Sequence, residues 1–261
     1  MLVKNDILGY KNREIFQDDE CFSFSLDSVM LANFATIRLR DKNILDLGTG
    51  NGVIPLILSL RTNKHIDGVE IQEYLADMAK KSVELNKLTN QIDIYNVDMK
   101  DFVTSDTIEN YDLIVCNPPY FKINEKNFLN LSIHKQIARH ELEITLSDIF
   151  CISKKLLTNN GNLVIVHRTT RLLEIFDLYR KNGIEPKRVQ FVYENSNKES
   201  TLVLVEGQKG GKPGLKIEKP FILYNEDGTI TSEYDTLCKE VRKWFKKAMM
   251  AVLHCIWFLH Q

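Results

Sequence analysis

A glycine-rich segment at residues 44–52, Ile-Leu-Asp-Leu-Gly-Thr-Gly-Asn-Gly, joins an apolar run to an amphipathic one. Glycine lets the backbone turn sharply and approach a ligand closely, and the glycines of this segment are Gly48, Gly50 and Gly52. Asp46 lies near the end of the apolar run, and Glu70 ends the next run, about 20 residues further on. In nucleotide-binding folds an acidic residue there accepts hydrogen bonds from ribose hydroxyls. The segment predicts a nucleotide-like ligand, although its spacing is not the dinucleotide fingerprint and a structural turn is the alternative.

A second candidate is Cys-Asn-Pro-Pro-Tyr at residues 116–120, directly after a predicted strand. Asn117 offers a side-chain carbonyl, and Pro118 and Pro119 stiffen the loop and leave nearby backbone carbonyls available as acceptors. Tyr120 supplies a flat ring on which a base can stack. An exocyclic amino group donates two hydrogen bonds, so two acceptors beside a stacking face suit it. A stiff turn is the alternative interpretation.

The third candidate is Asp98, in Val-Asp-Met-Lys-Asp-Phe at residues 97–102. It follows another predicted strand and faces the crevice at the carboxyl ends of the strands. An acidic residue there can meet an adenine amino group, and a solvated helix cap is the alternative. The candidate cofactor-binding set also includes Ile71, Met99 and Asn117.

Further candidates concern the substrate. Phe121, Arg139 and His140 belong to or border a segment (121–145) that we expect to line the crevice. Basic residues that could face phosphates include Arg168, Lys209 and Lys212, although a solvated lysine-rich surface is the default interpretation.

These residues need a scaffold of alternating strands and helices, which predicts a doubly wound, mostly parallel α/β sheet. Predicted strands cover 43–48, 65–71, 91–97, 111–117, 161–167, 186–193 and 200–206, and predicted helices cover 53–61, 74–87, 146–157 and 172–182. The last two strands are separated only by residues 194–199, which predicts an antiparallel hairpin at the sheet edge. Gly161 and Gly183 are expected to end helices. A hairpin is expected within 7–24, a helix capped by Ser25 or Asp27 over 25–39, and a loop over 207–217.

Composition indicates an ordinary globular protein, with 44% hydrophobic and 26% charged residues and a formal net charge of −1. Nucleic-acid binding would therefore require a local positive surface. The five cysteines show no metal-ligand spacing, so no metal is expected. The N-terminal residues show no apolar run flanked by basic residues, so we expect no signal peptide, and no run approaches the about 20 apolar residues that span a bilayer. We expect a cytoplasmic protein that does not bind membranes, and a monomer is favoured.

Taken together, these motifs resemble the Rossmann-like, S-adenosyl-L-methionine (AdoMet)-dependent amino-methyltransferases. Residues 46–52 are similar to the first motif of that superfamily, Glu70 to its ribose-binding acid, Asp98 to its adenine-side acid, and 117–120 to its catalytic tetrapeptide. Within the superfamily the chain, over about residues 5–235, is most similar to the bacterial tRNA(Val) adenine N6-methyltransferases, which modify the adenosine just 3′ of the anticodon. The stretches that carry this resemblance are 22–35, 46–59, 116–121, 138–141, 166–168 and 196–215.

The resemblance implies a Rossmann-like class I methyltransferase fold with a seven-stranded sheet of order 3-2-1-4-5-7-6, whose seventh strand is antiparallel. It implies residues 1–40 as a hairpin and helix packed on the core, 41–235 as the methyltransferase domain, and 236–261 as an atypical tail. AdoMet is the implied cofactor and tRNA the implied partner. Asn117 and the Pro118 carbonyl would accept hydrogen bonds from the N6 amino group while Tyr120 stacks on the base.

Two alternatives stay open at this point. Glutamine methyltransferases of release factors carry the same tetrapeptide, but they add an N-terminal helical domain, whereas only about 40 residues precede the glycine segment here. A non-catalytic RNA-binding module of the same fold is the other alternative, and degraded motifs would favour it.

Overall fold

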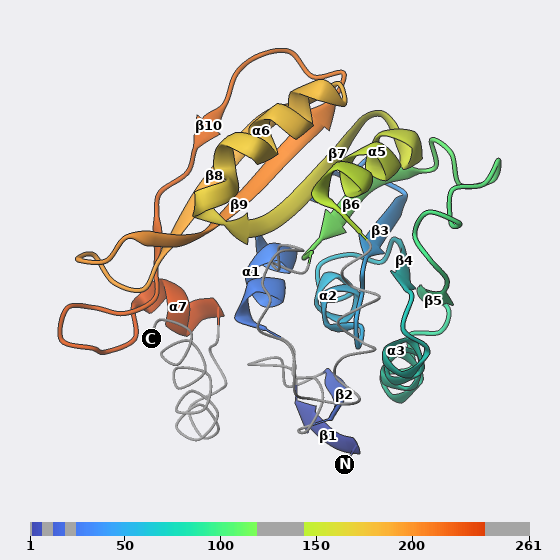
Figure 1. Cartoon of the computed structure of the whole chain (residues 1–261). Helices are drawn as coiled ribbons and strands as arrows, with labels where there is room; N and C mark the ends of the chain where they lie inside the picture. Colours follow the sequence, from blue (N-terminus) through green and yellow to red (C-terminus); the bar gives the residue numbers. More distant parts are fainter. Residues whose placement is uncertain (1, 7–12, 19–24, 119–143, 238–261) are drawn as a thin grey trace, which may run out of the picture.

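The computed structural model describes residues 2–6, 13–18, 25–118 and 144–237. One large sheet runs through the molecule in the order β10-β8-β9-β7-β6-β3-β4-β5, with β11 also paired to β8 (Figure 1). The strands are β3 (Asn43–Leu47), β4 (His65–Glu70), β5 (Ile92–Asn96), β6 (Tyr111–Cys116), β7 (Leu157–Arg168), β8 (Ile184–Tyr193), β9 (Ser200–Lys209), β10 (Lys216–Ile217) and β11 (Phe221–Ile222).

The predicted strand order is confirmed. Numbered along the chain from β3 to β9, the seven long strands stand in the order 3-2-1-4-5-7-6, and β9 pairs antiparallel with both β7 and β8. The sheet is nevertheless wider than the seven strands expected. The segment predicted as loop over 207–217 contains the end of β9 and all of β10, because the chain returns along the outer edge of β8 and pairs with it in parallel, first as β10 and then as β11.

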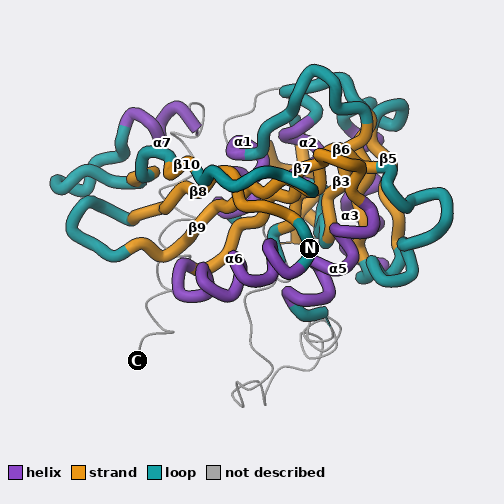
Figure 2. Tube along the Cα trace, turned by 90° about the horizontal axis from the view of Figure 1, so that it is seen from above, coloured by secondary structure: helices purple, strands orange, loops and turns teal. Residues whose placement is uncertain are grey.

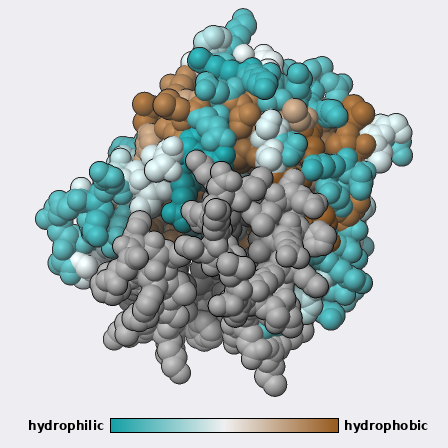
Figure 3. All heavy atoms as spheres, viewed as in Figure 1, coloured by the Kyte–Doolittle hydropathy of each residue, from teal (hydrophilic) through white to brown (hydrophobic). Residues whose placement is uncertain are grey.

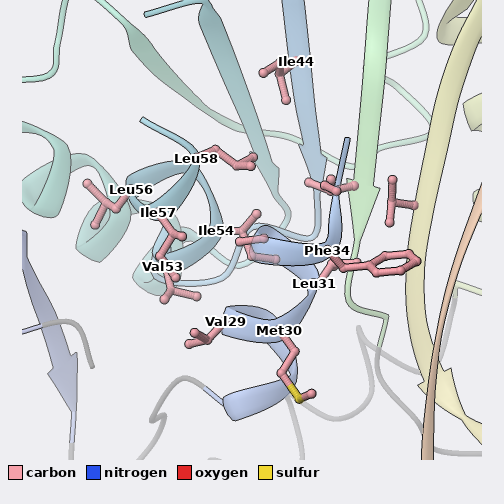
Figure 4. Close-up of a cluster of buried hydrophobic side chains, with 14 of the residues drawn as sticks. Val29, Met30, Leu31, Phe34, Ile44, Val53, Ile54, Leu56, Ile57 and Leu58 are labelled. Atoms are coloured by element: carbon pink, nitrogen blue, oxygen red, sulfur yellow. The ribbon is translucent and has the colours of Figure 1, made fainter. Parts of the chain in front are cut away.

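Helices cover both faces of the sheet (Figure 2). They are α1 (Leu26–Phe34), α2 (Val53–Leu58), α3 (Glu73–Leu85), α5 (Leu146–Leu156), α6 (Leu172–Lys181) and α7 (Ser232–Leu237), with a 3₁₀ turn at Thr169–Arg171. Successive strand residues alternate between the two cores. Ile44, labelled in Figure 4, packs with α1 and α2, and Leu113 and Val164 belong to the same cluster. Leu45 and Ile114 pack with α5 and α6 on the other face.

Two helix ends differ from expectation. The first helix ends at Phe34 rather than at 39, because the chain turns extended at Ala35 and Thr36 then reaches the sheet, where its hydroxyl donates to Glu206 Oε2 (2.9 Å). The helix before β7 ends at Leu156, so Gly161 lies inside a strand and not at a helix stop. Gly183 follows the end of α6 with φ of +70°, as predicted.

The N-terminal hairpin consists of β1 (Leu2–Asp6) and β2 (Glu14–Asp18), so it begins earlier than the predicted 7–24. Side chains tie β2 to α3, since the Phe16 amide donates to Ser82 Oγ (3.0 Å) and the Glu14 amide to Asn86 Oδ1 (3.0 Å). Asn51, within the glycine segment, donates to the Phe16 carbonyl (3.1 Å). The hairpin is thereby fixed against both α3 and the glycine segment.

Figure 3 shows the surface of the molecule from the same side as Figure 1. Apolar residues gather in the upper part of this view, and the described loop to the left of α7 is hydrophilic. None of the helices in the described ranges is long and apolar enough to cross a membrane.

Candidate active site

The glycine segment lies at one edge of the sheet, which we call the carboxyl edge because the parallel strands β3 to β7 end there. Gly48, Gly50 and Gly52 have φ angles of +74°, +57° and +87°, a region that L side chains rarely adopt. The amides of Gly48 and Thr49 both donate to the Val69 carbonyl of β4 (2.9 and 3.0 Å). A Cβ on Gly52 would come within 3.2 Å of Ala79 Cβ on α3. Glycine is therefore required here by backbone angle and, at Gly52, by close packing.

Glu70 ends β4, is buried and binds the glycine segment directly. Its Oε2 accepts a hydrogen bond from the Gly50 amide (2.9 Å), and its Oε1 accepts one from the Gln72 amide (2.9 Å). These bonds fix the carboxylate beside the loop. Each carboxylate oxygen can accept more than one hydrogen bond, so the same group can also hold ligand hydroxyls.

Asp46 is fully buried at the carboxyl edge of β3. Neither of its carboxylate oxygens has a hydrogen-bond partner among the described residues. The nearby Thr49 hydroxyl is also buried without a hydrogen-bond partner among these residues. Burial raises the pKa of Asp46 to about 7; the nearby Thr49 hydroxyl opposes this rise and the Glu70 carboxylate adds to it. A buried acid without a partner is costly. Its position beside three left-handed glycines fits a ligand that carries positive charge.

Residues 96–99, at the end of β5 and just after it, lie at the same carboxyl edge of the sheet. Asp98 is half-buried at the carboxyl edge of β5, and its Oδ1 accepts a hydrogen bond from the Lys100 amide (2.8 Å) within a turn, where the alternative interpretation expected a helix. Ile71 is 39% exposed, and Met99 packs at the rim of the α5/α6 core. Asn96, which sequence reasoning missed, donates to the carbonyls of both Glu70 and Ile71 (3.0 Å each). It fixes β4 to β5 where a ligand would lie.

Asn117 follows β6, whose Cys116 pairs with Leu47 of β3, so Asn117 stands level with Gly48. Its side-chain Nδ2 donates to Ser28 Oγ (2.9 Å) and lies 3.3 Å from Ser25 Oγ. Pro118 is buried behind it. The structure thus brings Asp46, the glycines, Glu70, Asp98 and Asn117 to one edge. The predicted site residues that lie outside the described residues are Pro119, Tyr120, Phe121, Arg139 and His140.

The predicted phosphate-binding residues are divided between two edges. Arg168 ends β7 at the carboxyl edge and is exposed. Lys209 lies at the opposite edge, where its Nζ contacts Glu109 Oε1 (3.0 Å) and the carbonyl of Leu157, the first residue of β7 (2.7 Å). Lys212 follows it, exposed. The two ends of β6 are separated by five strand steps of about 3.3 Å each, so the opposite ends of the sheet are about 16 Å apart along this strand, and both lysines lie at the end away from the glycine segment.

This arrangement defines the class of protein. Ligands of open α/β sheets bind outside the carboxyl ends of the strands, and here that crevice combines left-handed glycines, an acid at the next strand end and a buried, unpartnered carboxylate. The fold is that of class I methyltransferases, as predicted. A predicted O-methyltransferase from Agrobacterium tumefaciens has a similar structure, with a TM-score of 0.64 at 18% identity over 83% of this chain and 97% of that one. Geranyl diphosphate C-methyltransferase from Streptomyces coelicolor, solved with S-adenosyl-L-homocysteine, has a TM-score of 0.52 at 11% identity over 70% and 76%.

The chain belongs to the methyltransferase small domain family, whose model matches residues 25–175. The predicted cofactor class, AdoMet, is confirmed by this membership. Two similar proteins are the tRNA1(Val) (adenine(37)-N6)-methyltransferases of Parabacteroides distasonis and Flavobacterium psychrophilum. The first is 28% identical over 71% of this chain and 76% of its own length, and the second is 26% identical over 89% and 97%.

Proposed function

We propose that this protein transfers the methyl group of AdoMet to the exocyclic N6 of an adenosine in tRNA, the adenosine just 3′ of the anticodon of tRNA(Val). The single observation that carries the chemistry is Asn117, held by its amide nitrogen at the carboxyl edge level with the glycine segment. The relatives whose names specify adenine-37 of that tRNA support the substrate.

The residues present fit the cofactor. Glu70 would hold the ribose hydroxyls, Asp98 the adenine amino group, and Asp46 the cationic methionine end, with Gly48, Gly50 and Gly52 allowing close approach. The remaining members of the proposed cofactor-binding set are Ile71, Met99 and Asn117. AdoMet supplies an activated methyl group with its own leaving group, so this chain needs no nucleophile of its own. Its task is to align the acceptor nitrogen and exclude water.

The acceptor nitrogen would be held by Asn117 Oδ1 and the Pro118 carbonyl, which accept its two N–H groups and turn its lone pair toward the methyl group. Tyr120, with Phe121, would stack on the target base, which must leave its stack at a cost of a few kcal/mol. Anticodon-loop bases are single-stranded and accessible to such capture. Arg168 would contact a phosphate from the carboxyl edge, and Arg139 and His140 are further proposed substrate contacts. We also propose residues 41–235 as the catalytic domain, with 1–40 packed on it.

The test is incubation of the purified protein with labelled AdoMet and total tRNA from cells that lack the modification, followed by nucleoside mass spectrometry. We expect label in N6-methyladenosine and in tRNA(Val). Label on a release-factor glutamine instead would keep the chemistry and reject the substrate. Absence of transfer to either, with AdoMet bound, would favour a binding module.

A further inference from the structure

Ser25 and Ser28 contact Asn117 from the first turn of α1, 92 and 89 residues away in the sequence. Ser28 is only 7% exposed. Ser25 is the N-cap residue of α1, a position where serine usually accepts a hydrogen bond from an amide of the first turn. Here its side chain forms no cap hydrogen bond. Its hydroxyl is directed instead toward Asn117 Nδ2, at the outer limit of hydrogen-bond distance.

The helix that carries these serines is held firmly at its other end. Arg61 donates to the carbonyls of Ala32 and Ala35, the latter at 2.9 Å. The Arg188 guanidinium lies 4.4 Å from the centre of the Phe34 ring and pairs with the buried carboxylate of Glu206 (2.6 Å). Val29 and Leu31 are fully buried in the core below (Figure 4). The helix α1 is therefore a fixed support for its two hydroxyls.

We propose that Ser28, assisted by Ser25, is a positioning residue that anchors the Asn117 carboxamide through its amide nitrogen, with the carboxamide oxygen turned toward the acceptor nitrogen. The inference rests on the proposed function. The torsion that interchanges the amide nitrogen and oxygen of asparagine is soft, so the carboxamide needs an external constraint. With the nitrogen on Ser28, the oxygen is turned away from α1. In the reversed orientation Asn117 would present N–H groups to the N–H groups of the adenine, and donor would face donor.

The first test compares single-turnover methylation rates at saturating enzyme. Ser28→Ala should lower the rate about tenfold, the loss of one neutral hydrogen bond, while AdoMet and tRNA affinities stay unchanged. Ser28→Cys preserves volume but replaces the hydroxyl with a weak acceptor, so its rate should fall between the two. Ser153→Ala is the matched control, because Ser153 is a fully buried serine on α5 whose hydroxyl has no partner among the described residues. It should leave the rate unchanged.

Coupling separates positioning from general damage. If Ser28 acts through Asn117, adding Ser28→Ala to Asn117→Ala should slow the reaction no further than Asn117→Ala alone. An additional tenfold loss in the double variant, or a wild-type rate in folded Ser28→Ala, would overturn the proposal.

An NMR measurement tests the positioning role of Ser28 separately from the proposed function. If the wild-type protein does not methylate tRNA, the proposed function is rejected, but the measurement still shows whether Ser28 holds the Asn117 carboxamide. The Asn117 side-chain amide resonances are those missing from the spectrum of Asn117→Ala. In the wild type their exchange with water should be slowed by the serine contacts. Ser28→Ala should speed this exchange and shift both resonances, and Ser153→Ala should not. Unchanged resonances in Ser28→Ala would show that the carboxamide is fixed by other groups.

Discussion

The buried carboxyl of Asp46 should make cofactor binding depend on pH. Its pKa is raised to about 7 by burial, so near neutral pH the carboxyl of the free protein is partly protonated. AdoMet carries a sulfonium and an ammonium group, and both favour the ionised carboxylate. Binding should therefore release a proton below pH 7, and affinity should rise with pH up to that point.

The magnitude follows from the pKa. At pH 8 about ten-elevenths of the carboxyl is ionised and at pH 6 about one-eleventh, so the apparent dissociation constant should be about tenfold larger at pH 6. The ammonium of AdoMet resembles an α-amino group and loses its proton near pH 7.7–8.0. The cleanest window for the measurement is consequently about pH 5.5–7.5.

Within the described ranges, two other ionisable groups, Glu70 and Cys116, interact with this carboxyl. Glu70 acts on Asp46 by repulsion, and Cys116 on β6 is a buried thiol whose pKa burial raises well above its usual value, so it stays neutral. Glu70 is therefore the competing source of any pH dependence. Asp46→Asn removes the carboxyl group that we expect to release the proton, and Glu70→Gln removes the other carboxyl group that could cause a pH dependence. The two variants therefore form a matched pair.

The assay is isothermal titration of the protein with AdoMet at several pH values in two buffers of different ionisation enthalpy. AdoMet binding by the wild type should weaken about five- to sixfold from pH 7 to pH 6 and by nearly tenfold per pH unit below that, with proton release. Glu70→Gln should show the same shape displaced to lower pH, because the Glu70 carboxylate contributes to the raised pKa of Asp46. Asp46→Asn should bind more weakly at pH 7.5 and show a flat profile. A slope that survives in Asp46→Asn would refute the assignment.

The same carboxyl links pH to folding. A folded-state pKa above the unfolded 3.8 means that its contribution to stability is greatest below about pH 4 and is lost as pH rises to 7. The difference between these two pKa values corresponds to at most about 4 kcal/mol of stability. Urea unfolding of the ligand-free protein should show this loss in wild type and a smaller one in Asp46→Asn.

Other residues give further predictions. Asn117→Ala should retain most of its AdoMet affinity, because most of the proposed cofactor contacts lie on the glycine segment and at Glu70 and Asp98. It should reduce the single-turnover rate roughly 10²–10³-fold, by analogy with the loss of one positioned hydrogen-bond group, and a wild-type rate would mean that the tetrapeptide is only a stiff turn. Glu70→Gln should weaken AdoMet binding by about 1.5–3 kcal/mol in calorimetry at pH 7.5, and unchanged affinity would remove it from the site. Arg188→Met removes the ion-pair partner of the buried Glu206 carboxylate, which keeps its hydrogen bonds from Thr36 and Asn162. Urea unfolding should show a lower free energy of unfolding, by at most about 3–5 kcal/mol. Arg168→Glu should weaken tRNA binding and reduce the slope of its salt dependence by about the contribution of one phosphate contact. Lys209→Glu should change neither quantity. The opposite pattern in a filter-binding assay would place the RNA-binding surface at Lys209 and not at Arg168.

The sheet could be predicted because its strands are short apolar runs separated by amphipathic helices, a pattern that burial on both faces imposes. The absence of a helix at 194–199 also located the antiparallel pair. The two-residue strands β10 and β11 have no such signal, because they are defined by backbone pairing with β8 and not by burial of their own side chains. The end of α1 was equally hidden, since it depends on a contact between Thr36 and Glu206, 170 residues away.

The site residues also differ in whether the sequence alone could predict them. Glycines at a strand end and acids at the next strand ends follow from local spacing, and the structure places these residues together. The serines that orient Asn117 have no spacing relation to it, and Asn96 is recognisable only once β5 is paired with β4. Lysine content likewise does not reveal which edge a lysine occupies, as Lys209 shows.

The position of β9 has a consequence for folding during synthesis and for truncation of the chain. This strand lies between β7 and β8 although it follows both in sequence. While residues 200–209 are still being synthesised, β7 and β8 cannot pair with each other in the native arrangement, and each presents an unpaired edge whose inner side chains are apolar. The exposed loop at 194–199 therefore looks like a convenient boundary but is a poor place to truncate the protein. A fragment ending there would lose the central partner of the sheet's outer half and expose surfaces prone to aggregation.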